Sequence, residues 1–186
     1  MNNTSEKLIH ISAKNFSEKG YYGTSLNNIA NNLGVKKASL YNYIKSKDEL
    51  YGICLEKCME KGLTLIGNID TQSENLYEEL LSFFQKYIYD SDYLVKFYIQ
   101  LSFVPSNFTK VIEEYNNKLA SVFNEKLREI HAHNNVKLGQ DDFVSFINMF
   151  IHGWLYRTAF MQSKITKEEV INEFEHFIQL LMHKIT

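Results

Sequence analysis

The stretch SLNNIANNLGVKKASLYNYIKSKDEL, residues 25–50, decides the fold of the first part of the chain. Its first apolar residues recur at the spacing of an amphipathic helix: Leu26, Ile29, Ala30 and Leu33. Gly34 follows at once, where a helix end favours a residue that can adopt the left-handed conformation. A second apolar stripe begins at Val35. The stretch therefore predicts two short helices joined by a tight turn, the helix-turn-helix motif.

Cations, hydroxyls and an amide remain on the second helix outside its apolar stripe. In a helix-turn-helix motif this helix enters the DNA major groove, where such groups reach phosphates and base edges. The other interpretation is a small amphipathic helix with a solvated polar face. The order of the whole motif favours DNA binding. The residues expected to contact DNA are Ser25, Lys36, Lys37, Ser39, Tyr41, Asn42 and Lys47.

The first quarter of the chain resembles the N-terminal domain of the TetR family of bacterial transcriptional regulators. The resemblance lies in residues 16–50, FSEKGYYGTSLNNIANNLGVKKASLYNYIKSKDEL. The matching residues are Phe16, Gly20, Tyr21, Thr24, Ser25, Ile29, Ala30, Gly34, Val35, Lys37, Leu40, Tyr41, Tyr43, Lys47 and Leu50. Lys36 and Ala38 depart from the serine and glycine that are frequent in the family, so base preference does not carry over from a relative.

The charge distribution suits a module that contacts DNA at one end of the chain. Residues 1–50 hold seven lysines against four acidic residues, although the net charge of the chain is −2. Of the 20 basic and 22 acidic residues, 13 and 18 then fall in the remainder. The sequence has no long apolar run and no secretion signal at its N-terminus, so we expect a cytoplasmic protein without a membrane partner.

The remainder of the chain predicts helices only, so the expected fold is all-α. A capping box at a helix start has a serine or threonine followed three residues later by a glutamate. Three pairs have this spacing: Ser46 with Glu49, Thr71 with Glu74, and Thr166 with Glu169. The predicted architecture is a three-helix helix-turn-helix DNA-binding domain, residues 1–47, followed by a helical effector-binding and dimerisation domain, residues 48–186.

The last two predicted helices carry more apolar surface than a small monomer covers easily. Residues 141–162 are apolar on nearly every side, and the final helix has an apolar stripe. A partner subunit covers such helices as a four-helix bundle. The resemblance implies the same homodimer. The expected interface residues are Phe143, Ile147, Ile151, Val170, Phe174, Phe177, Ile178 and Leu181.

The middle of the chain is rich in aromatic residues with a few polar side chains among them. Most of these belong to a packed core, but apolar walls with a few polar groups are also typical of ligand sites. The resemblance implies an effector site in this region. The residues expected to line it are Phe97, Gln100, Phe103, Tyr115, Asn148, His152 and Trp154.

Motifs for catalysis, metal binding or a cofactor are missing. The sequence has no glycine-rich phosphate loop, nucleophile elbow or paired-cysteine zinc pattern, so we predict neither an enzyme nor a metal or cofactor site. Cys54 and Cys58 are expected to be buried small hydrophobic residues, with a thiol sensor as the other interpretation.

Together these features predict a homodimeric, sequence-specific DNA-binding regulator, a repressor that a small hydrophobic or aromatic effector releases from a palindromic operator. The alternative is a helical small-molecule binding or carrier protein whose helix-turn-helix no longer regulates DNA. Operator sequence, effector identity, target genes and the sign of regulation do not follow from these residues.

Overall fold

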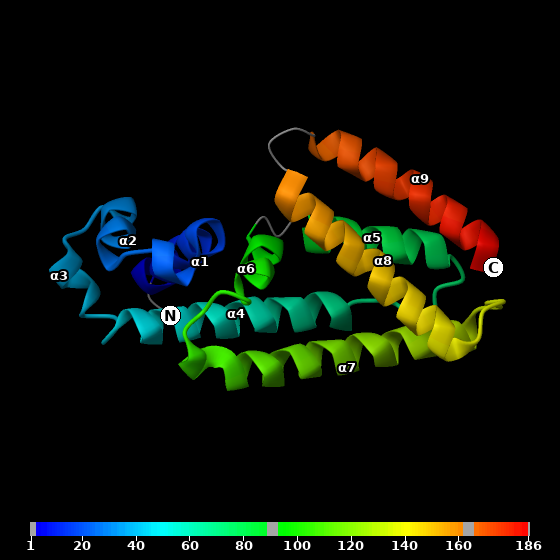
Figure 1. Ribbon diagram of the computed structural model, residues 1–186, viewed down its shortest axis with the longest axis horizontal. Helices are drawn as coiled ribbons and strands as arrows, with labels where there is room; N and C mark the ends of the chain where they lie inside the picture. Colours follow the sequence, from blue (N-terminus) through cyan, green and yellow to red (C-terminus); the bar gives the residue numbers. More distant parts are fainter. Residues whose placement is uncertain (1–2, 89–92, 162–165, 186) are drawn as a thin grey trace. The chain divides into compact units, whose positions relative to one another are not determined.

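The computed structural model describes residues 3–88, 93–161 and 166–185. Within these ranges every regular element is a helix, which confirms the all-α prediction (Figure 1). The chain divides into two compact units. The first comprises residues 1–61 and 96–116, and the second comprises residues 62–95 and 117–186. No helix of the described residues is both long and apolar enough to cross a membrane.

The first unit contains the helix-turn-helix and a segment that returns to it later in the sequence. Its elements are α1 (Asn3–Gly23), α2 (Leu26–Leu33), α3 (Lys37–Leu40), the first part of α4 (Lys47–Gly67), most of α6 (Leu94–Gln100), η1 (Ser106–Phe108) and the start of α7 (Thr109–His133). Gly20 interrupts α1 with a φ of 68°, a left-handed conformation that glycine adopts without the steric cost of a side chain. Gly20 therefore marks a kink inside the longer element.

Aromatic rings form the centre of the first unit. The ring of Tyr51 on α4 lies 5.0 Å from that of Phe16, 5.5 Å from that of Phe97 and 4.8 Å from that of Phe108, measured between centroids. Phe97 and Phe108 come from the returning segment, and all four side chains are buried. Because rings of this size bury a large apolar area each, this cluster joins the segment to α1 and α4.

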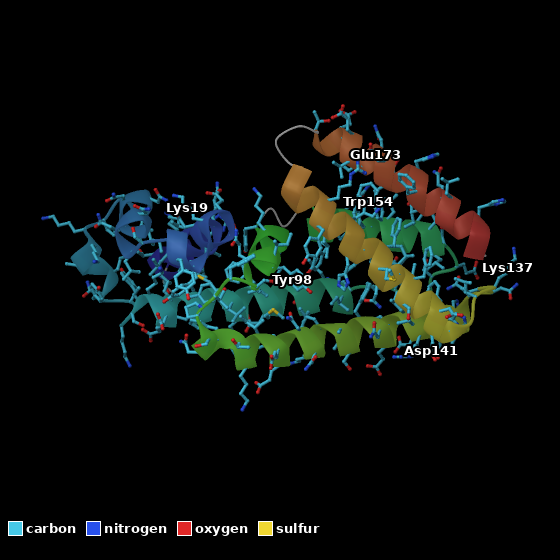
Figure 2. The ribbon with its side chains drawn as sticks, viewed as in Figure 1. Lys19, Tyr98, Lys137, Asp141, Trp154 and Glu173 are labelled. Atoms are coloured by element: carbon cyan, nitrogen blue, oxygen red, sulfur yellow. The ribbon has the colours of Figure 1, made fainter. Side chains whose placement is uncertain are left out.

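The second unit contains the rest of α4 and α7 together with three further helices. They are α5 (Leu76–Ile88), α8 (Gln140–Met161) and α9 (Lys167–Ile185), which lie side by side in Figure 1. Phe84 of α5 stacks on Phe174 of α9, and the Trp154 ring of α8 meets both edge-on at 6.0 and 5.5 Å between centroids. Arg157 of α8 forms an ion pair with Glu173 of α9, and its guanidinium lies over the Trp154 ring. Figure 2 labels Trp154 on α8 and Glu173 on α9.

Two of the three predicted capping boxes are present. The hydroxyl of Ser46 accepts from the Glu49 amide at 3.0 Å, and the Thr166 hydroxyl accepts from the Glu169 amide at 3.2 Å. The Glu49 carboxylate accepts from the backbone N–H of Lys45, one residue before the expected position.

The box predicted at Thr71 and Glu74 is wrong. Helix α5 begins at Leu76, and the Asn75 side chain accepts from the Glu78 amide at 3.3 Å. The preceding chain is held in a turn, because the Asp70 side chain accepts from the Gln72 amide at 3.0 Å. Thr71 is buried in that turn and caps no helix.

Candidate DNA-binding surface

The turn between α2 and α3 has the geometry that the sequence predicts. Ser25 caps α2, with its hydroxyl accepting from the Asn28 amide at 3.1 Å. Gly34 adopts φ 76° and ψ 27°, the left-handed conformation, and the Val35 amide donates back to the Ala30 carbonyl at 3.0 Å. These bonds satisfy groups at both ends of α2, so its length is fixed locally.

Residues 36–44, which we call the recognition segment, form a short helix that continues as tighter turns. Helix α3 comprises only Lys37–Leu40, and then the amides of Asn42 and Tyr43 donate to the carbonyls of Ser39 and Leu40 at 3.3 and 2.8 Å. These bonds span three residues, as in a 3₁₀ helix. Leu40 and Ile44 are buried and anchor the segment.

The structure places most of the predicted DNA contacts on the surface of this segment. Lys36, Lys37, Tyr41 and Asn42 are exposed, and Ser39 is half-buried. The hydroxyl of Ser25 is already engaged as the cap of α2, so it has less freedom to bind DNA. The contacts of these residues with DNA stay predictions.

Lys47 lies at the start of α4 and is half-buried. Its Nζ atom is 4.2 Å from the centroid of the Tyr21 ring, a cation–π contact. Partial burial lowers the pKa of the Lys47 ammonium, and the nearby Asp48 carboxylate opposes that change. The side chain is therefore held against the Tyr21 ring of α1.

Buried polar side chains beneath the surface join α1 to the helix-turn-helix. The Thr24 hydroxyl is within 3.0 Å of the Asn15 carbonyl and 2.8 Å of the Gly20 carbonyl. The Asn32 amide donates to the Asn15 side chain at 3.3 Å. Sequence reasoning missed Asn15, whose signal is a polar residue next to the apolar face of α1. Because buried polar groups are costly when unpaired, these bonds make the position of α2 on α1 specific.

The residues predicted to line an effector site are divided between the two units. Phe97, Gln100, Phe103 and Tyr115 belong to the first unit, and Asn148, His152 and Trp154 belong to the second. Phe97 and Trp154 are buried, whereas the Phe103 side chain is 68% exposed and His152 is exposed. The Asn148 amide donates to the Asn124 side chain and to the Val144 carbonyl, both at 2.8 Å. The effector site stays a prediction.

Most residues predicted at the dimer interface are covered within one chain. Phe143, Ile147, Ile151, Val170, Phe174 and Ile178 are all buried. Phe177 is 48% exposed, and the Leu181 side chain lies outside the described residues. Other apolar side chains of α8 and α9 are exposed instead: Phe146, Met149, Tyr156 and Leu180. These six residues are therefore buried within a single chain, and Phe143 for instance packs against His131 of α7.

Cys54 and Cys58 are buried free thiols, as expected of small hydrophobic residues. Burial raises the pKa of both thiols, that of Cys58 to about 12. Thiolates are the reactive form, so we expect both groups to react slowly in the folded chain. Within the described residues no group of three or more metal-ligating side chains occurs.

Comparison with known proteins gives the same assignment over nearly the whole chain. The family described as bacterial regulatory proteins, tetR family, matches residues 8–52, and the tetracyclin repressor-like C-terminal domain matches residues 68–183. The chain belongs to the TetR family. It is therefore a transcriptional regulator with an N-terminal helix-turn-helix, and the family and its named relatives confirm the prediction that it is not an enzyme.

The relatives include named regulators. The chain is 29% identical over 180 residues to the biofilm operon icaADBC negative transcriptional regulator IcaR of Staphylococcus epidermidis, covering 96% of both chains. It is 27% identical over 179 residues to IcaR of Staphylococcus aureus strain Newman, again covering 96% of both.

Solved structures of other family members share the fold. A TetR family regulator from Agrobacterium tumefaciens aligns with a TM-score of 0.75 at 13% identity, covering 98% of this chain and 97% of that one. A regulator from Aquifex aeolicus VF5 aligns with a TM-score of 0.71 at 19% identity, covering 96% and 99%. At these identities the likeness extends to the fold alone.

Proposed function

We propose that the chain is a homodimeric repressor that binds a two-fold symmetric operator in the cytoplasm and is released by a small hydrophobic or aromatic effector. The observation that carries this proposal is the recognition segment. Its apolar side is buried, and Lys36, Lys37, Tyr41 and Asn42 are exposed on the surface. Negative regulation rests on the likeness to IcaR, which is named a negative transcriptional regulator.

The exposed groups fit both parts of DNA recognition. Lys36 and Lys37 supply charge for phosphates, which gives affinity without sequence preference. Asn42 offers an amide that can pair with the major-groove edge of adenine. Gly34 and the Ser25 cap hold this segment at a fixed angle to α2, so the surface is organised before DNA arrives.

Dimerisation would use the apolar side chains that α8 and α9 leave exposed. On α8, Phe146, Met149 and Tyr156 are exposed and recur at three and seven residues, which places them along one helix face. On α9, Phe177 and Leu180 are 48% and 51% exposed. A two-fold partner that presents the same faces would cover both sets and form a four-helix bundle.

The effector proposal rests on aromatic side chains with few charged groups among them. In the first unit Phe97 stacks on Tyr51, whose buried hydroxyl has no hydrogen-bond partner among the described residues. A ligand that accepts or donates one hydrogen bond there would remove that cost. A highly charged effector is disfavoured, because an unpaired charge is expensive to bury.

A binding experiment tests the regulator against the carrier-protein alternative. DNA from the region upstream of the gene is titrated with the protein in a gel shift, followed by footprinting of the shifted complex. A regulator protects an inverted repeat, and Asn42→Ala changes its preference among variants of that repeat. Protection of no site, with retained binding of a lipophilic ligand, would instead support the carrier protein.

A further inference from the structure

Asp48 holds two hydrogen bonds that join distant parts of the sequence within the first unit. The Tyr21 hydroxyl at the end of α1 donates to one carboxylate oxygen, and the Asn107 amide of η1 donates to the other at 3.2 Å. These donors lie 27 residues before and 59 residues after Asp48. A single carboxylate in the first turn of α4 thus ties α1 to the segment that returns from α6.

The aromatic cluster places each donor where the carboxylate can accept from it. Phe108 is buried next to Asn107, and its ring lies 6.0 Å from the Tyr21 ring between centroids. Tyr21 also meets Tyr51 edge-on at 5.2 Å. Burial and the hydrogen bond to Asp48 raise the pKa of Tyr21 to about 12, so its hydroxyl stays protonated and continues to donate at neutral pH.

The same tyrosine supports the lysine that we expect to meet DNA. The Lys47 ammonium lies over the Tyr21 ring, whose hydroxyl end is fixed by Asp48. A long lysine side chain has many rotamers, and immobilising it only on binding costs free energy. A ring held in one orientation reduces that cost, because the ammonium is then already confined over the ring.

We propose that Asp48 is a positioning residue for DNA binding, which orients Lys47 through Tyr21 and makes that orientation depend on Asn107. This inference rests on the proposed function. It goes beyond it by joining η1 to the DNA contact. Any change that withdraws η1 from Asp48 leaves the carboxylate with one donor and loosens Tyr21. The DNA affinity then falls although no residue of the recognition segment has changed.

The test uses three substitutions that do not themselves change the charge of the chain. Asn107→Ala removes one donor, Tyr21→Phe removes the other and leaves the ring under Lys47, and Ser106→Ala is the matched control on the same turn. Each is made in the full chain and in a Lys47→Ala background. DNA affinity is measured by fluorescence anisotropy on the footprinted site, and folding is followed by thermal melting.

The account predicts that Asn107→Ala and Tyr21→Phe each weaken DNA binding about threefold per subunit, the size expected for solvent-accessible bonds. Ser106→Ala has no effect, and the melting temperatures do not change. In the Lys47→Ala background the two variants add no further loss. Equal losses in both backgrounds, or an Asn107→Ala protein with wild-type affinity, would overturn the inference. If the wild-type protein itself binds no DNA, the proposed function fails first.

Discussion

The two units differ in how locally their structure is specified. In the first unit the helix ends, the glycine turn and the exposed polar groups lie within residues 25–50, so neighbours in sequence determine one another's geometry. In the second unit the burial of Trp154 depends on Phe84 and Phe174, which come from other helices far away in the sequence. Function that is encoded in a local motif is therefore readable from sequence, whereas a surface created by packing is not.

A charge inside the second unit should have the largest effect. Phe174→Asp places a carboxylate among Phe84 and Trp154, where it has no partner, and we expect a loss of about 3–5 kcal/mol in unfolding free energy. Phe177→Asp changes a side chain that is 48% exposed, so the chain stays folded and loses only self-association.

Thermal melting and sedimentation separate these two outcomes. If Phe174→Asp melts like the wild type and sediments as a folded monomer, the interface lies at Phe174 itself. The internal packing of Phe174 would then be the wrong explanation for its burial.

Replacing the two glycines that have a positive φ should give the next largest loss of stability. The two variants also compare two backbone positions within the first unit. Gly34→Ala introduces only conformational strain of about 1–2 kcal/mol, because an added Cβ meets nothing within 4 Å. Gly20→Ala adds more strain, because φ 68° with ψ 177° lies in a region that essentially only glycine occupies. Its Cβ would also lie 2.9 Å from Oε1 of Gln100, so that side chain must move. Chemical denaturation should therefore rank Gly20→Ala as the more destabilising variant. The reverse order would contradict the backbone conformation at Gly20.

Removing a helix cap should lower the unfolding free energy by about 1 kcal/mol where the capping side chain accepts a hydrogen bond from a backbone amide. Ser46→Ala and Asn75→Ala should each cost this amount, because their side chains accept from the amides of Glu49 and Glu78. Glu74→Ala is the matched control, since α5 begins after it. A destabilised Glu74→Ala protein would restore the capping box that the sequence predicts at Thr71.

The capping boxes show what sequence reasoning can and cannot reach. The same spacing occurs at Ser46, Thr71 and Thr166, and only the first and last start a helix. At Thr71 the side chain of Asp70 accepts a hydrogen bond within a turn and Asn75 caps the helix instead, so neighbouring polar side chains decide where the helix begins. Likewise the sequence predicts that α8 is apolar on nearly every side and that α9 has an apolar stripe, but which part of this surface other helices cover depends on packing.

The Asp48 contacts illustrate the same limit inside the first unit. Lys47 is predicted to contact DNA because of its place after the recognition segment. Nothing local indicates that Asn107, 59 residues after Asp48, donates to the neighbouring carboxylate. Such long-range polar pairs leave no periodic signal in one sequence.

The two cysteines should give the smallest effect. At pH 8 the native chain should react negligibly with iodoacetamide, and the unfolded chain should take up two equivalents, because burial raises both thiol pKa values. Folded thiols hold their protons more tightly than unfolded ones. Their contribution to stability is therefore present at neutral pH and is lost as pH rises from about 9 towards 12. Rapid labelling of native protein would reopen the thiol-sensor interpretation.

The most direct test of the central claim is the salt dependence of operator binding for wild type and Lys37→Ala, with Lys110→Ala as a control on an exposed lysine of α7. Fluorescence anisotropy gives the slope of log affinity against log salt. If the protein binds DNA as a dimer through its two recognition segments, Lys37→Ala weakens binding and reduces the slope by about two, because each subunit loses one phosphate contact. Lys110→Ala leaves both unchanged. An Lys37→Ala protein with the affinity and slope of the wild type would contradict the account.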